Sequence, residues 1–257
     1  MSLDYSLKNG VATLRLNRPQ VFNSINRELA LALQARLREC QASASVRVVV
    51  LTGTGKAFCA GQDLGEITGP NRPEVADIVE ELYNPIVLLL RELDKPVLAA
   101  VNGVAAGAGA NLALACDVVV ARASASFVQA FSKIGLVPDS GGTYFLPRLV
   151  GLQKAAALML LGDKVPAAEA ERMGMIYQVF SDEAFDQEVA ALTQKLAALP
   201  TKALAYTKQL LNGTFGNDLA HQLRAEGDYQ LRASATADYR EGVSAFVEKR
   251  QPTFTGQ

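Results

Sequence analysis

Asp139 stands in a stretch whose composition suits proton transfer. It follows an apolar run, residues 134–138, and precedes Ser140 and two glycines. A carboxylate in an apolar loop loses hydration, which raises its pKa and makes it a stronger base. The same position also fits a structural role, because Asp or Ser before a helix commonly caps its N-terminus. The local sequence leaves both roles open for Asp139.

Two glycine-rich stretches, residues 56–64 and 101–111, contain backbone groups that could serve the same chemistry. Both follow apolar strands and lead toward helices, so their small residues let a ligand approach the main chain. Unpaired amides at a helix start favour negative charge, and two facing amides form an oxyanion hole. Small residues after strands are also common in tight turns and close helix packing, so their spacing alone does not establish a site. Neither stretch matches a dinucleotide fingerprint or a P-loop.

The cysteines, the histidine and the other acid of these stretches do not suggest a further catalytic site. The chain has three cysteines, scattered without a metal-type pair, which favours a reduced cytoplasmic setting. Cys59 has only Lys56 as a basic neighbour in sequence, so we expect it to fill space rather than act as a nucleophile. The single histidine, His221, follows a polar stretch typical of a helix start, and we expect a structural role. Asp63 is expected to cap a helix.

The elements that must position these residues follow from hydrophobic spacing. Strands and helices alternate through residue 121, which predicts an α/β fold with crossover connections. Asn9-Gly10 predicts a hairpin, and Pro85 a kink or break within its helix. We expect strands at 46–51, 96–101, 117–121 and 176–180, helices at 25–40, 75–93 and 110–116, and mostly helix after residue 150.

Bulk properties exclude several classes of protein. The 257 residues carry a formal net charge of −1, so no overall field attracts a polyanion. No apolar run approaches the roughly 20 residues that span a bilayer, and the first residues lack a signal-peptide pattern. We therefore expect a cytoplasmic protein without a membrane or nucleic-acid partner.

Five ordered motifs resemble those of the crotonase (enoyl-CoA hydratase/isomerase) family. They are Leu16-Asn17-Arg18-Pro19, residues 57–64 (AFCAGQDL), residues 99–107, residues 141–148 and residues 246–250. The resemblance implies a spiral of repeated β-β-α units. It places the spiral core and acyl-CoA site in residues 1–195, and a C-terminal helical region of the same structural unit in residues 196–257. That region would mediate assembly into trimers, often paired into hexamers.

Carried over by position, the resemblance implies a site for an acyl-CoA thioester. It assigns the oxyanion-hole amides to Gln62 and Ala108, and it implies no metal or redox cofactor, since CoA is part of the substrate. Six further residues are implied around the substrate: Val21, Phe22, Ala60 and Leu64 along the CoA path, and Phe246 and Lys249 near the nucleotide end, across a subunit boundary.

The acids separate hydratases from isomerases in this resemblance. Hydratases of the family carry two glutamates, at positions that are Asn111 and Phe131 here. Asp139 stands where isomerases carry their single acid, and one base suffices to move a proton from one carbon to another. Apolar neighbours such as Phe131, Leu136 and Val137 would help to exclude water, and Asn111 would either orient the substrate or cap a helix.

The resemblance thus implies an isomerase in which Asp139 carries the proton. Residues 101–110, 130–133, 138–143, 173–176 and 238–243 are similar to an isomerase branch of the family. The expected reactions are conversion of ring-1,2-epoxyphenylacetyl-CoA to oxepin-CoA and a 3-enoyl- to 2-enoyl-CoA double-bond shift. An enoyl-CoA hydratase and a non-catalytic RNA-binding relative are the alternatives, the latter opposed by the net charge.

Overall fold

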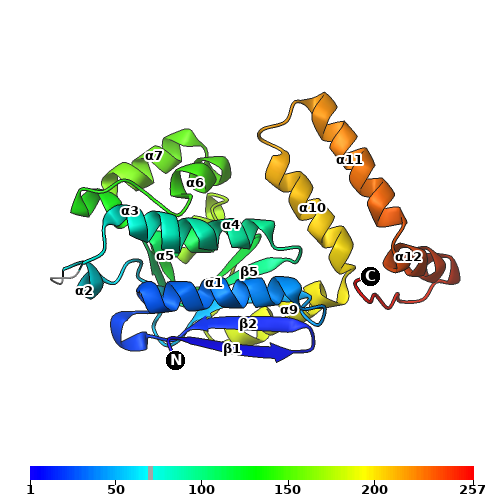
Figure 1. Cartoon of the computed structure of the whole chain (residues 1–257), viewed down its shortest axis with the longest axis horizontal. Helices are drawn as coiled ribbons and strands as arrows, with labels where there is room; N and C mark the ends of the chain where they lie inside the picture. The colour runs from blue at the N-terminus through cyan, green and yellow to red at the C-terminus, as the bar shows by residue number, and fades with distance from the viewer. Residues whose placement is uncertain (69–71) are drawn as a thin grey trace.

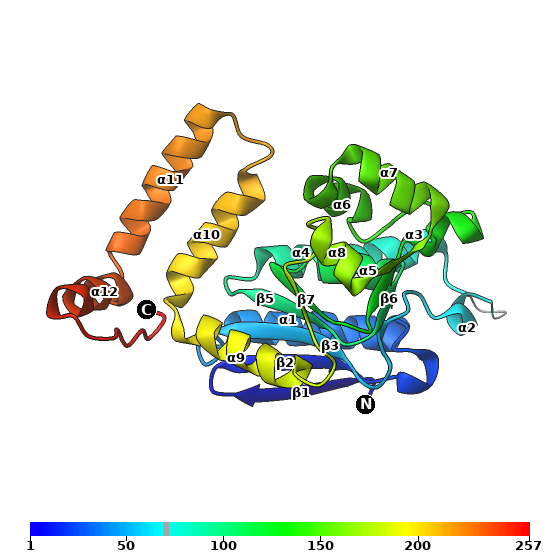
Figure 2. The same cartoon turned by 180° about the vertical axis from the view of Figure 1, so that it is seen from behind.

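Two β-sheets form the centre of the protein, which is described by a computed structural model over residues 1–68 and 72–257 (Figures 1 and 2). The larger sheet has the order β1-β2-β3-β5-β7-β10, with strands Leu3–Lys8, Val11–Leu16, Val48–Gly53, Val97–Val101, Val118–Arg122 and Gln178–Phe180. The smaller sheet has the order β4-β6-β8-β9, with strands Ala57–Cys59, Val104–Ala106, Ser126–Val128 and Lys164–Pro166.

The chain alternates between the two sheets. β3, β5 and β7 pair in parallel in the larger sheet, and each is followed by β4, β6 or β8, which lie in the smaller sheet. Each pair of strands then leads into helical structure. The predicted α/β spiral of β-β-α units is therefore confirmed. The short strands β4, β6, β8 and β9 were not predicted, because three residues are too few to display a period.

The predicted hairpin is present at the edge of the larger sheet. β1 and β2 pair antiparallel, with Lys8 opposite Val11. The turn residues Asn9 and Gly10 have φ values of 51° and 79°. These are the positive values that a two-residue hairpin turn requires, and glycine and asparagine adopt them at least cost.

Helices cover both faces of the larger sheet. α1 (Arg27–Ala42) and α4 (Asn84–Glu92) pack on one face and α9 (Phe185–Ala198) on the other. In α1, Leu29, Leu33 and Leu37 are buried at successive helical turns, and each such burial is worth about 1.5–3 kcal/mol. The Asn26 side chain accepts from the Leu29 amide at 3.0 Å and caps α1. α1 therefore begins after Ile25, where the prediction had placed its first residue.

A π-helix lies inside the helical stretch that was expected to break at Pro85. α3 (Val75–Asp77), η2 (Ile78–Tyr83) and α4 follow one another without interruption. The Asn84 amide donates to the Val79 carbonyl, five residues back. The wider turn ends just before Pro85, the residue that cannot donate a helical N–H. Of the predicted kink or break, a break is absent, and the irregularity before Pro85 is a change of helix type.

The remaining helices complete the layers. They are η1 (Pro19–Val21), α2 (Leu64–Ile67), α5 (Ala108–Leu114), η3 (Ala130–Ile134), α6 (Gly142–Val150), α7 (Leu152–Leu161) and α8 (Ala167–Arg172). Three more, α10 (Thr201–Gly213), α11 (Leu219–Ser234) and α12 (Ala237–Glu248), form an arm that extends away from the sheets (Figures 1 and 2). The expected division between residues 195 and 196 falls within α9, and the arm begins at α10. None of the described helices is long and apolar enough to cross a membrane.

Candidate active site

A cavity of about 720 Å³ lies at the end of the molecule opposite the C-terminal arm, beside α2 and α3. Five segments line it: the end of η1 and the residues after it, the loop before α2 with α2 itself, the segment from Arg72 through η2, the start of α5, and the segment from η3 to Asp139. The predicted residues Gln62, Ala108 and Asp139 all line this cavity. The fold thus brings the two glycine-rich stretches and the acid together.

The two glycine-rich loops approach each other closely. Gly61 has a φ of +88°, and a Cβ there would lie 2.9 Å from the Ala106 carbonyl oxygen and 3.5 Å from the Ala108 amide nitrogen. Only glycine permits this approach without strain. No described residue accepts a hydrogen bond from the Gln62 or Ala108 amide. Two neighbouring free amides at the cavity wall can bind one oxygen and stabilise negative charge on it.

Asp139 is in the loop between η3 and α6, and it does not cap α6. The N-cap of α6 is Gly141, without a side-chain bond, and only the Asp139 backbone carbonyl accepts from the Gly142 amide, at 2.8 Å. The Asp139 carboxylate accepts from the Ser140 hydroxyl at 2.9 Å. Burial raises the pKa of Asp139, while the Ser140 hydrogen bond opposes the rise. The carboxylate is thus left to face the cavity as a strengthened base.

Asn111 supports Asp139 from behind the cavity. Its side chain is buried, donates to the Asp139 carbonyl oxygen at 2.9 Å and accepts from the Gln129 amide at 2.7 Å. It does not cap a helix, and it is not among the residues that line the cavity. The structure therefore gives Asn111 a positioning role through the loop, in place of the predicted contact with substrate.

Residues 6–257 match the sequence model of a family described as enoyl-CoA hydratase/isomerase. The chain belongs to this family. It is 49% identical over 255 residues to the 1,2-epoxyphenylacetyl-CoA isomerase of Escherichia coli strain K12, with 98% of this chain and 97% of that protein covered. It is 44% identical over 256 residues to a probable enoyl-CoA hydratase of Rhodobacter capsulatus, with 100% and 98% covered.

Solved structures of the enoyl-CoA hydratase/isomerase family superpose over the whole chain. An enoyl-CoA hydratase from Bacillus anthracis gives a TM-score of 0.95 at 33% identity and covers 100% of both chains. One from Mycobacterium smegmatis gives 0.91 at 33% identity, with 99% of each chain covered. The expected fold is therefore confirmed.

Four further residues that the family resemblance placed near the substrate do line the cavity: Val21, Ala60, Leu64 and Phe131. Phe22 does not. It has a φ of 53° and an exposed side chain, and its carbonyl accepts from the Ala60 amide at 3.0 Å. Phe22 thus shapes the loop through its backbone rather than by side-chain contact with the cavity.

Phe246 and Lys249 are on the C-terminal arm, away from the cavity of the same chain. Phe246 is exposed in α12, and Lys249 ends that helix with a φ of 53°. Within one chain, neither residue is brought to the site. His221 is also on the arm, where its amide donates to the capping side chain of Asp218 at 2.8 Å. His221 is thus not among the residues that line the cavity.

The other acid and thiol of the first glycine-rich stretch have structural roles. The Asp63 carboxylate caps α2 by accepting from the Gly65 amide at 2.9 Å, and pairs with Arg18 at 2.7 Å. Cys59 is fully buried, and burial raises the pKa of its thiol to about 12. It therefore stays protonated at neutral pH, and both expectations are confirmed.

Tyr83 and the apolar wall that accompanies it were not identified from the sequence as part of the site. Ile78, Val79 and Tyr83 of η2, together with Ile134, line the cavity. The spacing of Ile78 and Val79 predicts only a buried helical face, which does not show whether a side chain contacts the core or a ligand. Leu136, which was expected to help exclude water, also lines the cavity, whereas Val137 is exposed and does not.

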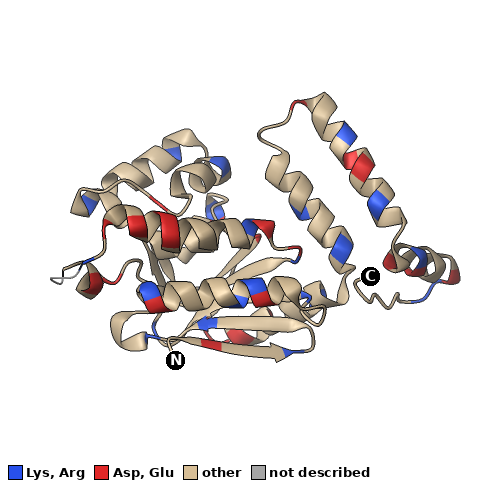
Figure 3. Cartoon of the chain, in the orientation of Figure 1, with Lys and Arg blue, Asp and Glu red and all other residues tan. Residues whose placement is uncertain are grey.

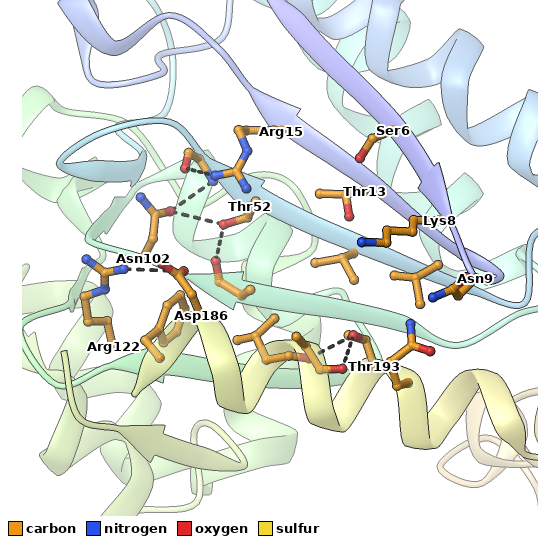
Figure 4. Close-up of a pocket in the computed structure, with 18 of the residues that line it drawn as sticks. Ser6, Lys8, Asn9, Thr13, Arg15, Thr52, Asn102, Arg122, Asp186 and Thr193 are labelled. Atoms are coloured by element: carbon orange, nitrogen blue, oxygen red, sulfur yellow. Dashed lines mark hydrogen bonds and ion pairs between the residues drawn. The ribbon is translucent and has the colours of Figure 1, made fainter. Parts of the chain in front are cut away.

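A second crevice, of about 650 Å³, lies on the opposite face of the larger sheet, beside α9 (Figure 4). Its polar groups are mainly engaged with the protein itself. Asn102 accepts from the Gly53 amide at 3.0 Å, and Arg122 lies 3.6 Å from Asp186. The crevice contains none of the predicted site residues.

Charged residues of both signs are distributed over the surface. Acidic and basic side chains are interspersed along α1 and α11 (Figure 3). Neither helix therefore presents the single basic stripe that is typical of nucleic-acid-binding surfaces.

Proposed function

We propose that the protein is an acyl-CoA isomerase in which Asp139 is the only proton carrier. The proposal rests on the ion pairing and the solvent exposure of the carboxylates that line the cavity. Among the described lining residues these are Asp63, Glu74 and Asp139. Asp63 is neutralised by Arg18, and Glu74 is exposed to solvent. Only Asp139 is both unpaired with a cation and partly desolvated.

The reaction begins with the thioester oxygen between the Gln62 and Ala108 amides. Charge that develops on this oxygen is stabilised, by about 10²- to 10³-fold in rate per donor. The carbon next to the carbonyl becomes acidic, and Asp139 removes its proton to leave an extended enolate. The same carboxyl group returns the proton at the γ carbon, so the double bond moves from the 3- to the 2-position and no co-reactant is consumed.

The same proton transfer accounts for a ring-epoxide substrate. A 1,2-epoxide of a phenylacetyl thioester can expand to an oxepin by opening the carbon–carbon bond that the two rings share. The oxepin then has a 3-enoyl double bond, and moving a proton from the α to the γ carbon conjugates it with the thioester. The apolar wall formed by Ile78, Val79 and Phe131 suits a hydrocarbon ring, and the E. coli relative's name supports this substrate.

A hydratase is the second candidate, because the Rhodobacter capsulatus relative is described as one. Hydration needs one group to activate water and another to manage the α proton. The residues at the two hydratase positions, Asn111 and Phe131, cannot act as acids or bases. We therefore favour isomerisation, for which the acyl-CoA thioester suffices without a resident cofactor.

The deciding experiment follows the absorbance of the conjugated thioester with two substrates. With a 3-enoyl-CoA we expect the absorbance to appear, and with a 2-enoyl-CoA we expect it to persist. Rapid loss of the 2-enoyl absorbance would favour the hydratase. In a second assay, an epoxidase generates ring-1,2-epoxyphenylacetyl-CoA in the reaction mixture. Chromatography that accounts for all of this substrate then tests for the oxepin product.

We also propose that the C-terminal arm joins copies of the chain into a trimer or a pair of trimers. Exposed apolar side chains gather on α11 and α12, among them Leu223, Leu231, Phe246 and Val247. A groove of about 910 Å³ runs between α10, α11 and α12. A neighbouring copy that covered this surface would bring Phe246 and Lys249 toward a second subunit's CoA path.

A further inference from the structure

The hydroxyl of Tyr83 is bonded to the side chain of an oxyanion-hole residue. Tyr83 is the last residue of η2, is almost fully buried and lines the cavity together with Asp139. Its Oη donates to Oε1 of Gln62 at 2.7 Å. Gln62 is the residue whose backbone amide would bind the thioester oxygen. The Tyr83 hydroxyl therefore contacts the loop that carries a proposed oxyanion donor.

The other end of the Gln62 side chain is held as well. Its Nε2 donates to Oε2 of Glu66 at 3.0 Å. Glu66 in turn accepts from the backbone amide of Arg27, at the start of α1, at 2.9 Å. The Gln62 carboxamide is thus clamped between the π-helix and the junction of α1 and α2.

The backbone of Gln62 is fixed on its opposite side by a short parallel bridge. The Ile25 amide donates to the Gly61 carbonyl at 2.7 Å, and the Asp63 amide donates to the Ile25 carbonyl at 2.9 Å. The bridge uses the Gly61 carbonyl and the Asp63 amide, and it leaves the Gln62 amide between them without a partner. Bridge and side-chain clamp together restrict rotation of the peptide that carries the proposed oxyanion donor.

Glu66 determines the direction of the clamp. A carboxylate only accepts, so the Gln62 NH₂ group faces Glu66 and the Gln62 oxygen faces Tyr83. Burial, with the nearby acids Asp139 and Glu66 among the further causes, raises the pKa of the Tyr83 phenol far above neutrality, so it keeps the proton that it donates to Gln62. A flipped amide would place its oxygen against the Glu66 carboxylate.

We propose that Tyr83 is a positioning residue for the oxyanion hole, holding the Gln62 amide in place through the Gln62 side chain. The inference rests on the proposed function, in which that amide binds the thioester oxygen. Tyr83 acts on the rate of enolate formation without exchanging a proton with the substrate.

A double-mutant cycle tests the proposal with Tyr83→Phe, Gln62→Met and the double variant. Methionine keeps the length of glutamine and its backbone amide but makes no comparable hydrogen bond. We expect each single change to lower kcat by about 10- to 100-fold, since small misplacements of catalytic groups have effects of this size. KM should change much less. The double variant should resemble Gln62→Met, because that change already removes the contact that Tyr83→Phe breaks, together with the bond to Glu66.

A spectroscopic readout separates positioning from a general loss of structure. A conjugated thioester such as cinnamoyl-CoA absorbs at longer wavelength when hydrogen bonds polarise its carbonyl. Wild type and Asp139→Asn should both produce this red shift on binding, whereas Tyr83→Phe and Gln62→Met should reduce it. Tyr177→Phe, at an exposed tyrosine outside the cavity, is the matched control and should behave as wild type.

The outcomes distinguish this proposal from the proposed function. If wild type isomerises 3-enoyl-CoA and Tyr83→Phe retains both its kcat and its red shift, positioning by Tyr83 is refuted and the function stands. Multiplicative losses in the double variant also refute it, since they indicate that Tyr83 acts separately from Gln62. If wild type neither isomerises the substrate nor shifts the absorbance, both proposals fail. Should Tyr83→Phe not fold, Gln62→Met reports on the same contact.

Discussion

The side chain of Asn111 donates a hydrogen bond of 2.9 Å to the backbone carbonyl oxygen of Asp139. This bond joins α5, whose first residue carries one proposed oxyanion donor, to the loop that carries the proposed base. Gln129 holds the oxygen of the same Asn111 side chain at 2.7 Å. One buried amide therefore links the helix that begins at a proposed oxyanion donor to the loop that carries the proposed base. Asparagine at position 111 therefore has a structural role of its own, in addition to replacing the glutamate that hydratases carry there.

Replacing Asp139 with asparagine should abolish proton transfer without disturbing the site. Asparagine keeps the shape of aspartate but is not a base, and general-base catalysis contributes about 10²- to 10⁴-fold. We expect isomerase turnover to fall by at least this factor, while calorimetry still detects acyl-CoA binding and light scattering gives an unchanged mass. Near-wild-type turnover in Asp139→Asn would remove Asp139 from the mechanism.

The raised pKa of Asp139 predicts how stability depends on pH. The folded state binds this proton more tightly than the unfolded state, whose aspartate has the ordinary value of 3.8. The contribution of Asp139 to stability is therefore fully present below that value and is lost as pH rises through the folded pKa. Asp139→Asn should match wild type in acid and become the more stable protein above the folded pKa. Denaturant unfolding across pH measures the difference, and a constant difference would contradict the raised pKa.

The raised pKa of Asp139 also predicts how kcat/KM declines at low pH. Asp139 acts as a base only when ionised, so kcat/KM should decline at a pH above 3.8, the ordinary aspartate value. The limb should follow the titration of Asp139 as read from the stability difference between wild type and Asp139→Asn. Two clearly different midpoints would assign the limb to another group.

Removing the Asn111 amide should harm both stability and rate. Asn111→Ala leaves the buried Gln129 amide without its partner, at about 1–3 kcal/mol, and removes one of the two donors to the Asp139 carbonyl, which the Gly142 amide still contacts. We expect a lower free energy of unfolding and a lower kcat. Asn217→Ala removes an exposed amide bonded to Gln222 at 3.0 Å and should change stability by no more than about 0.5 kcal/mol. Equal effects of the two changes would contradict the role of Asn111.

A methyl group at Gly61 should separate the two amide-bearing loops. Its Cβ would lie 2.9 Å from the Ala106 carbonyl oxygen, at a φ of +88° that only glycine adopts freely. Gly61→Ala should therefore lose most isomerase activity and the red shift of bound cinnamoyl-CoA. Gly216→Ala is the control, because its Cβ would meet nothing closer than 3.7 Å. Retained activity in Gly61→Ala would mean that the loops tolerate a wider gap.

The amino-acid sequence by itself determined the architecture and the chemical inventory. Asn9-Gly10 specified a hairpin, the leucines of α1 specified a buried helical face, and the ordered motifs around Gln62, Ala108 and Asp139 indicated the family. These features are local in sequence, so turn chemistry and hydrophobic period suffice to read them. The observed boundaries of longer elements differ from the predicted ones by a few residues. Caps such as Asn26 and tertiary bonds such as the Ile25 bridge decide where a helix begins.

Only the tertiary structure decided which role each polar residue plays. Asp139 had two possible roles, and capping is excluded because the α6 N-cap is Gly141. Asn111 became a buried support for the loop, and Tyr83, which no sequence pattern singled out, became the partner of Gln62. Each of these bonds joins residues at least 21 positions apart. A hydrogen bond is directional and short-ranged, so its partner depends on how distant segments pack, which spacing along the chain does not encode.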